Sequence, residues 1–117
     1  MKETSYRTVN LEDGRPVLSE AIDRLDREIK YSKTLKVGIL KLIHGYGSSG
    51  RGGRLRTGVR ARLDELKANG AVRFYVKGED FSIFNAEAVK LLDECGELRR
   101  ERDLNRENRG VTFVRLK

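Results

Sequence analysis

The sequence lacks most of the residues that stabilise small extracellular domains or build common metal sites. It has no tryptophan, one proline, one cysteine and one histidine among 117 residues. The single cysteine, Cys95, cannot form an intramolecular disulfide, and no cluster of Cys and His with zinc-ligand spacing is present. These absences exclude disulfide-stabilised domains and zinc fingers, and they predict that the protein has no metal-binding site built from Cys and His. They also favour a cytoplasmic location.

Long apolar segments are also absent. The amino terminus, MKETSYRTVNL, has no apolar run of the signal-peptide kind, and no segment approaches the roughly 18 apolar residues of a membrane span. The length suits one compact domain. We therefore expect residues 1–117 to form a single domain with no membrane partner. A monomer is compatible with the sequence, which leaves the oligomeric state open.

Positive charge, in contrast, is abundant. Lysine and arginine number 25 against 18 acidic residues, which gives a net charge of +7. Arginine dominates, and its planar guanidinium binds phosphate oxygens in pairs, where lysine offers a point charge. This balance favours a polyanionic partner, DNA or RNA before others.

Hydrophobic periodicity predicts the order of the regular elements. The expected elements are a strand at 6–11, a helix from about 17 to 29, a strand at 34–43, a helix at 54–68, a strand at 72–77 and a strand at 110–116. This order is typical of an α/β fold with a mostly parallel sheet and an antiparallel last strand. The near-continuous apolar run at 34–43 indicates a central strand buried on both faces.

Residues 80–109 form an insertion between the last two predicted strands. Asn85 is a suitable N-cap for a short helix, whose apolar residues lie on one face. The continuation, ELRRERDLNRENR, loses this apolar stripe and becomes strongly charged. We expect a helix that packs on the body, followed by a mobile basic segment that could dock an acidic protein partner.

The predicted strands bring distant residues to one edge of the sheet. Right-handed helical crossovers make the first three strands parallel, and such folds bind ligands at the carboxyl ends of these strands. Asn10, Glu12 and Asp13 follow the first strand, and His44 follows the second. We expect these side chains to face one another across a single cleft.

The stretch IHGYGSSGRGGRLR, residues 43–56, is the clearest candidate for a binding site. Glycines permit positive φ and close approach of the backbone, and the helix that follows presents unpaired N–H groups to an anion. The predicted phosphate-binding residues are Gly45, Tyr46, Gly47, Gly50, Arg51, Gly53, Arg54, Arg56 and Arg60. The GK[ST] ending of a phosphate-binding loop is absent, which argues against a nucleoside triphosphatase. A loop selected only for solubility is the alternative.

His44 has two interpretations from its position. It can be a structural residue that hydrogen-bonds the loop backbone. Alternatively, the adjacent helix N-terminus lowers its pKa, and the neutral imidazole serves as a general base or a phosphate ligand.

The stretch that begins IHGYG resembles the signature of the Smr (small MutS-related) domain. His44, Gly45, Tyr46 and Gly47 stand at the positions of its His-Gly-x-Gly motif, and Leu55-Arg56 matches the start of its helix. The resemblance implies a two-layer α/β sandwich of β-α-β-α-β-β order with a four-stranded mixed sheet, related to the C-terminal domain of translation initiation factor three. It also implies DNA or RNA binding and, in many members, endonuclease activity.

The first strand departs from the family pattern. Members commonly carry Asp-Leu-His at its end, where this chain has Asn10-Leu11-Glu12. An amide cannot act as a base, so we favour sequence-tolerant binding of backbone phosphates. The alternative is a nuclease in which His44 works with Glu12 or Asp13, with Mg²⁺ as a cofactor if the site is catalytic.

Overall fold

The computed structural model describes residues 3–47 and 51–117. Its elements are β1 (Tyr6–Asn10), α1 (Leu18–Thr34), β2 (Ile39–Ile43), α2 (Arg51–Ala68), β3 (Val72–Lys77), α3 (Ala86–Glu94) and β4 (Val111–Leu116), with short 3₁₀ helices η1 (Gly78–Asp80) and η2 (Gly96–Arg100). The predicted order is confirmed. Within those residues, no helix has the length and apolar character needed to cross a bilayer.

The four strands form one mixed sheet in the order β1-β2-β4-β3. β1 pairs with β2 in parallel, and β4 runs antiparallel to both of its neighbours. The first three strands therefore point the same way, as predicted. A mostly parallel sheet would pair the third strand directly with the second. Here β4 lies between β2 and β3, so that pairing is absent.

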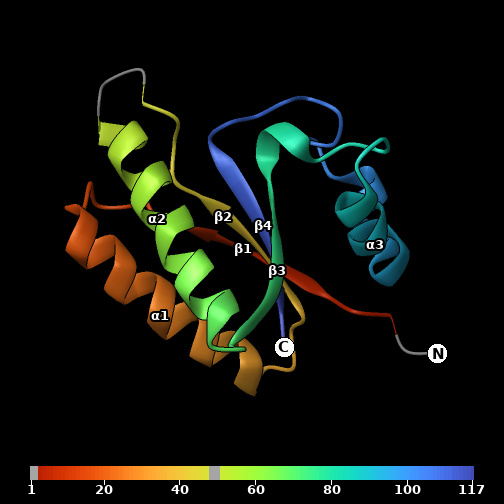
Figure 1. The fold of residues 1–117 in the computed structure, drawn as a ribbon, viewed down its shortest axis with the longest axis horizontal. Helices are drawn as coiled ribbons and strands as arrows, with labels where there is room; N and C mark the ends of the chain where they lie inside the picture. Colours follow the sequence, from red (N-terminus) through yellow and green to blue (C-terminus); the bar gives the residue numbers. More distant parts are fainter. Residues whose placement is uncertain (1–2, 48–50) are drawn as a thin grey trace.

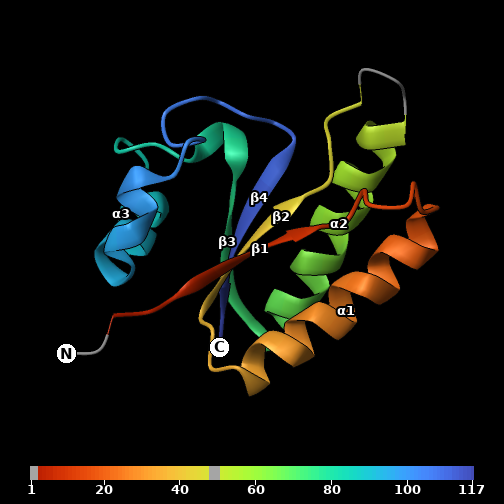
Figure 2. The ribbon, with the colours of Figure 1, turned by 180° about the vertical axis from the view of Figure 1, so that it is seen from behind.

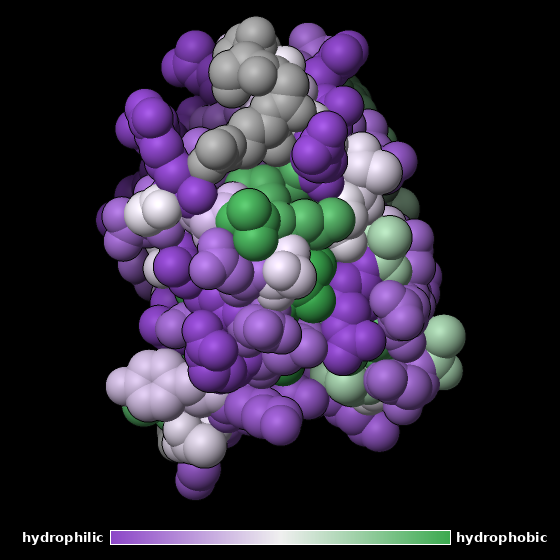
Figure 3. All heavy atoms as spheres, turned by 90° about the vertical axis from the view of Figure 1, so that its left-hand side faces the viewer, coloured by the Kyte–Doolittle hydropathy of each residue, from purple (hydrophilic) through white to green (hydrophobic). Residues whose placement is uncertain are grey.

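Helices cover both faces of the sheet (Figures 1 and 2). α1 and α2 lie on one face, which gives the expected two-layer sandwich, and the inserted α3 lies on the other. β2 serves both cores because its side chains alternate: Leu40 and Leu42 pack toward α1 and α2, whereas Ile39 and Ile43 pack toward α3. The outer side of α1 and α2 is mostly hydrophilic (Figure 3).

Local signals in the sequence fix the ends of the helices. α2 stops at Asn69-Gly70, where Gly70 has φ +83° and provides the left-handed conformation that closes a helix. Asn85 caps α3, since its side-chain oxygen accepts the N–H of Ala88 at 2.9 Å. Both assignments made from the sequence are confirmed.

The charged end of the insertion is anchored to the sheet, which differs from the mobile segment expected from the sequence. Lys41 on β2 is 5% exposed, and its Nζ lies 2.6 Å from carboxylate oxygens of both Glu101 and Asp103. Asp103 also accepts a hydrogen bond from Asn108 at 3.0 Å. The acidic residues of the segment thus turn inward, where they neutralise a buried ammonium.

Electrostatic coupling in this cluster outweighs the cost of burial. Burial lowers the pKa of Lys41, but hydrogen bonds to Asp103 and Glu101 outweigh that effect and raise it above the usual value. Burial likewise raises the pKa of Asp103, yet the hydrogen bonds from Lys41 and Asn108 bring it below its usual value. Lys41 and Asp103 are therefore charged at neutral pH.

Replacement of Lys41 by methionine should destabilise the protein by about 3–5 kcal/mol, because it leaves two buried carboxylates without their counter-ion. Denaturant unfolding would measure this loss. Arg99→Met is the matched control, since its pair with Asp93 is largely exposed and should contribute less than about 1 kcal/mol. Equal losses in the two variants would contradict a buried ionic anchor.

Candidate functional site

The carboxyl ends of β1 and β2 meet the start of β4 at one edge of the sheet (Figure 1). Leu11 donates its N–H to the carbonyl of Ile43 at 2.8 Å, and the N–H groups of His44 and Gly45 both lie 3.0 Å from the carbonyl of Gly110. The structure therefore brings together the end of β1, residues 44–47 (the HGYG loop) and Gly110, directly after the insertion. The topology predicted that the end of β1 and this loop would lie close together.

Glycines allow the loop and the start of α2 to approach closely. Gly45 and Gly47 have φ values of 78° and 99°, a region that other residues rarely adopt. A side-chain carbon on Gly53 would lie 3.6 Å from the Cα of Gly47. The first turn of α2 therefore lies against the loop. Of the predicted binding residues, Gly50 lies outside the described residues, as does the side chain of Arg51.

The backbone N–H groups of the loop divide into two sets. Those of His44 and Gly45 are occupied by the carbonyl of Gly110, so these two amides are not available to an anion. Those of Tyr46 and Gly47 have no acceptor within residues 3–47 and 51–117. The first turn of α2 adds amides that have no carbonyl partner inside the helix. An anion between the loop and the first turn of α2 would therefore have N–H donors from both segments.

His44 is fully buried, with 0% of its surface exposed. Its Nδ1 lies 2.7 Å from the carbonyl oxygen of Gly45 and its Nε2 lies 2.8 Å from Oγ1 of Thr112. A carbonyl oxygen only accepts, so Nδ1 carries the proton and Nε2 accepts the Thr112 hydroxyl. This neutral tautomer uses both nitrogens, which agrees with the structural interpretation of His44 and leaves neither nitrogen free for proton transfer.

The pKa of His44 falls from 6.5 to about 4. Burial is the largest cause, and the positive charges of Arg60 and Arg56 lower it further, against an opposing hydrogen bond with the Gly45 carbonyl. The expectation of a lowered pKa is met, but mainly through burial. The sequence could not show this, because the residues that enclose the imidazole come from β4 and α2.

Arg60 is engaged inside the protein, which differs from its predicted contact with phosphate. Its guanidinium binds the Glu79 carboxylate in a two-pronged arrangement at 2.9 and 2.8 Å, and its Nε donates to Oγ1 of Thr112 at 3.1 Å. The side chain is 11% exposed. Burial raises the pKa of Glu79, but the hydrogen bonds from Arg60 hold it below its usual value. Neither Glu79 nor Thr112 was identified from the sequence.

Arg54 and Arg56 keep their charges available. Arg54 is exposed and Arg56 is half-buried, and neither has an ion-pair partner within the described part of the chain. Arg56 is close enough to lower the pKa of His44. Two arginines near the start of α2 thus carry charges that no carboxylate among the described residues neutralises.

The acidic residues after β1 do not form a metal site. Asn10 has a structural role, since its side-chain oxygen accepts the N–H of Glu12 at 2.9 Å, and Arg24 binds the Asp13 carbonyl at 2.7 Å. Glu12 is half-buried and Asp13 exposed. Among residues 3–47 and 51–117, no group of three or more His, Cys, Asp or Glu side chains converges on one point. These donors therefore do not fit a Mg²⁺ ion.

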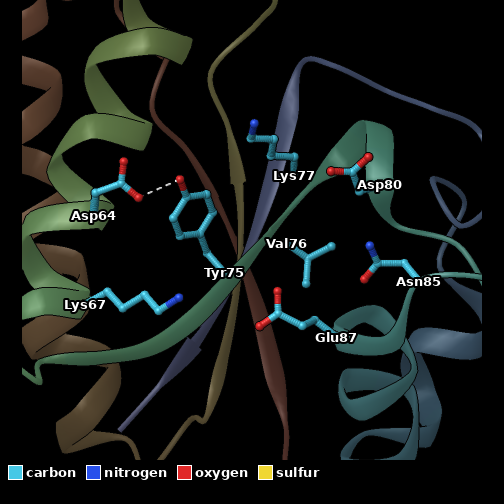
Figure 4. Close-up of a pocket in the computed structure, with 8 residues that line it drawn as sticks. All are labelled: Asp64, Lys67, Tyr75, Val76, Lys77, Asp80, Asn85 and Glu87. Carbon is cyan, nitrogen blue, oxygen red and sulfur yellow. Dashed lines mark hydrogen bonds between the residues drawn. The ribbon is translucent and has the colours of Figure 1, made fainter.

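A polar pocket of about 230 Å³ lies between α2, β3 and α3 (Figure 4). Asp64, Asp80 and Glu87 line it together with two lysines, so acidic groups outnumber basic ones. The Tyr75 hydroxyl donates to Asp64 at 2.8 Å, and burial together with this carboxylate raises the pKa of Tyr75 to about 12. With more carboxylates than ammonium groups, this pocket suits an anion less well than the loop edge does.

Comparison with known proteins identifies a solved structure with a similar fold. No protein-family model and no curated protein sequence matches the chain. The crystal structure of the Smr domain of Thermus thermophilus MutS2 is similar: the TM-score is 0.54 at 19% sequence identity, over 97% of this chain and 99% of that chain. The chain therefore has an Smr-like fold, as the HGYG motif and the order of the elements indicated.

The buried imidazole should make the protein less stable in mild acid. The unfolded chain binds a proton at His44 below about pH 6.5, whereas the folded chain does so only below about 4. The free energy of unfolding should therefore be constant above pH 6.5 and fall by about 3 kcal/mol as the pH decreases toward 4, since one pKa unit corresponds to about 1.4 kcal/mol.

Denaturant unfolding of wild type and His44→Asn between pH 4 and 7.5 would measure this dependence. The variant should be less stable at neutral pH and should lose less stability over this interval, because it lacks the imidazole and keeps only the smaller contributions of Glu79 and Asp103 near pH 4. An identical slope in both proteins would show that His44 is not the group responsible.

Proposed function

We propose that this chain is a nucleic-acid-binding domain that holds backbone phosphates at the HGYG loop. The observation that carries the proposal is the set of N–H groups at Tyr46, Gly47 and the first turn of α2, flanked by Arg54 and Arg56. Amides at a helix N-terminus bind oxyanions, and guanidinium groups add charge-assisted hydrogen bonds. The groups recognise phosphate and no base, so binding tolerates any sequence.

The role of His44 in this proposal is to position the loop. The hydrogen bond from Nδ1 to the Gly45 carbonyl at 2.7 Å fixes the peptide that leads into Tyr46 and Gly47. A general base needs a nitrogen that can reach the reacting proton, and both nitrogens of this imidazole are engaged. The replacement of the family's Asp-Leu-His by Asn10-Leu11-Glu12 points the same way. These features support binding over cleavage.

The exposed apolar tip before α3 favours a second role, as a protein-interaction adaptor. Phe84 is 91% exposed and Ile83 is 50% exposed. Their backbone is held in place, since the N–H of Ile83 binds Asn105 Oδ1 at 3.1 Å. A rigid apolar tip of this kind suits a small hydrophobic recess in a protein partner.

Replacing Arg54 and Arg56 together by glutamine should weaken binding to duplex DNA and flatten its salt dependence. Each phosphate contact contributes roughly 0.9 to the slope of log K against log salt, so the double variant should lose roughly 1.8. Fluorescence anisotropy at several salt concentrations would measure both quantities. Lys30→Gln with Lys36→Gln is the matched control, because it removes two charges at the carboxyl end of α1 and in the turn that follows it, away from the loop. Equal slopes in the two double variants would contradict a local phosphate site.

Incubation with supercoiled plasmid and with structured RNA, with and without Mg²⁺, tests the nuclease alternative. We expect both substrates to remain intact while still bound. Cleavage that persists through purification and disappears in Glu12→Gln or Asp13→Asn would favour the nuclease and contradict the binding-only proposal.

A further inference from the structure

We propose that a hollow on the other flank of the HGYG loop receives one unstacked nucleobase of the bound strand. This inference rests on the proposed function and adds a ligand class to it. It assigns the phosphate to the α2 side of the loop and the attached base to the α3 side, so that Tyr46 and Gly45 stand between the two.

The hollow has the size and position of a small-ligand site. It encloses about 390 Å³, within the range of about 300–1,000 Å³ that such sites occupy. Its lining comes from three parts of the chain: the α3-facing side of β1 and β2, the HGYG loop and the end of the insertion. The lining residues are Thr8, Lys41, Ile43, Gly45, Tyr46, Arg102, Asp103, Asn108, Gly110 and Val111.

Tyr46 supplies an aromatic surface at the rim. It is 57% exposed, and a side-chain carbon on Gly110 would lie 3.4 Å from its Cδ1. The absence of a side chain at Gly110 therefore lets the ring rest against the backbone there. Exposed tyrosines beside a phosphate-binding loop are suited to stack on a base, since every base has a π-face.

The charges of the hollow favour an uncharged ring over a second phosphate. Lys41 and Arg102 are balanced by Asp103 and by Glu101, which pairs with Lys41, so the ionic groups at the hollow sum to zero and do not draw in a second phosphate. Arg102 is exposed at the rim, where it can contact the adjoining phosphate. Ile43 and Val111 give the floor an apolar surface that accepts the face of a base.

The amide and the carboxylate that line the hollow are already used within the protein. Asn108 donates to Asp103 at 3.0 Å and accepts the N–H of Gly110 at 2.8 Å, and Asp103 is bound to Lys41. Groups already paired cannot read the edge of a base. The hollow should therefore select an unpaired base without selecting its identity, which favours single strands and flaps over a duplex that keeps its bases stacked.

The test compares three ligands of equal phosphate number by fluorescence anisotropy: a mixed-sequence single-stranded oligonucleotide, an abasic phosphodiester strand and a blunt duplex. Wild type should bind the base-bearing single strand roughly 5- to 100-fold more tightly than the abasic strand, the range expected for one stacked base. Tyr46→Ala should remove this advantage and leave abasic binding unchanged, whereas Tyr46→Phe should keep it.

Two further variants make the test independent of the loop. Thr8→Phe places a large side chain at an exposed position on the wall of the hollow and should also remove the advantage of the single strand. Tyr31→Ala on α1, where the ring is 53% exposed, is the matched control for loss of an exposed aromatic ring and should leave all three affinities unchanged.

The outcomes separate this inference from the proposed function. If wild type binds single-stranded and abasic ligands equally, or if Tyr46→Ala weakens both alike, the base site is wrong while the phosphate site stands. If wild type binds none of the three ligands, the proposed function itself fails.

Discussion

The edge of the sheet depends on one requirement, that every polar atom buried there finds a partner. A chain of hydrogen bonds meets it: the Gly45 carbonyl, the His44 imidazole, the Thr112 hydroxyl and the Arg60 guanidinium follow one another, and Glu79 closes the series. Each group is satisfied only when the imidazole is neutral and protonated on Nδ1. Because the chain joins β2, β4, α2 and η1, it fixes the position from which the HGYG loop leaves the sheet.

The same requirement explains why the insertion is part of the body. Lys41 occupies an otherwise apolar strand, and a buried ammonium needs nearby carboxylates. Glu101 and Asp103 provide them from the far end of residues 80–109. In doing so they bring Asn108 and Gly110 against the loop, where they form a wall of the hollow beside Tyr46. A structural ion cluster on one face thus shapes a candidate binding surface on the edge.

The arginines near the site serve two different purposes. Arg60 supports the fold, since its charge is matched by Glu79 and its nitrogens are engaged. Arg54 and Arg56 have no such partner among the described residues. A net charge of +7 favours a polyanionic partner, while the pairing of individual guanidinium groups separates the arginines used within the fold from those that are not.

The sequence by itself determined the order of the elements, the caps at Gly70 and Asn85 and the HGYG loop, because spacing, capping and glycine content are local properties of the chain. It also indicated the Smr-like fold. Only the tertiary structure decided that His44 is enclosed, that Arg60 is internal and that the charged end of the insertion is anchored. The partners that decide these roles lie 68, 52 and 60 residues away, and no local pattern encodes which distant side chain will neutralise a buried charge or occupy a buried nitrogen.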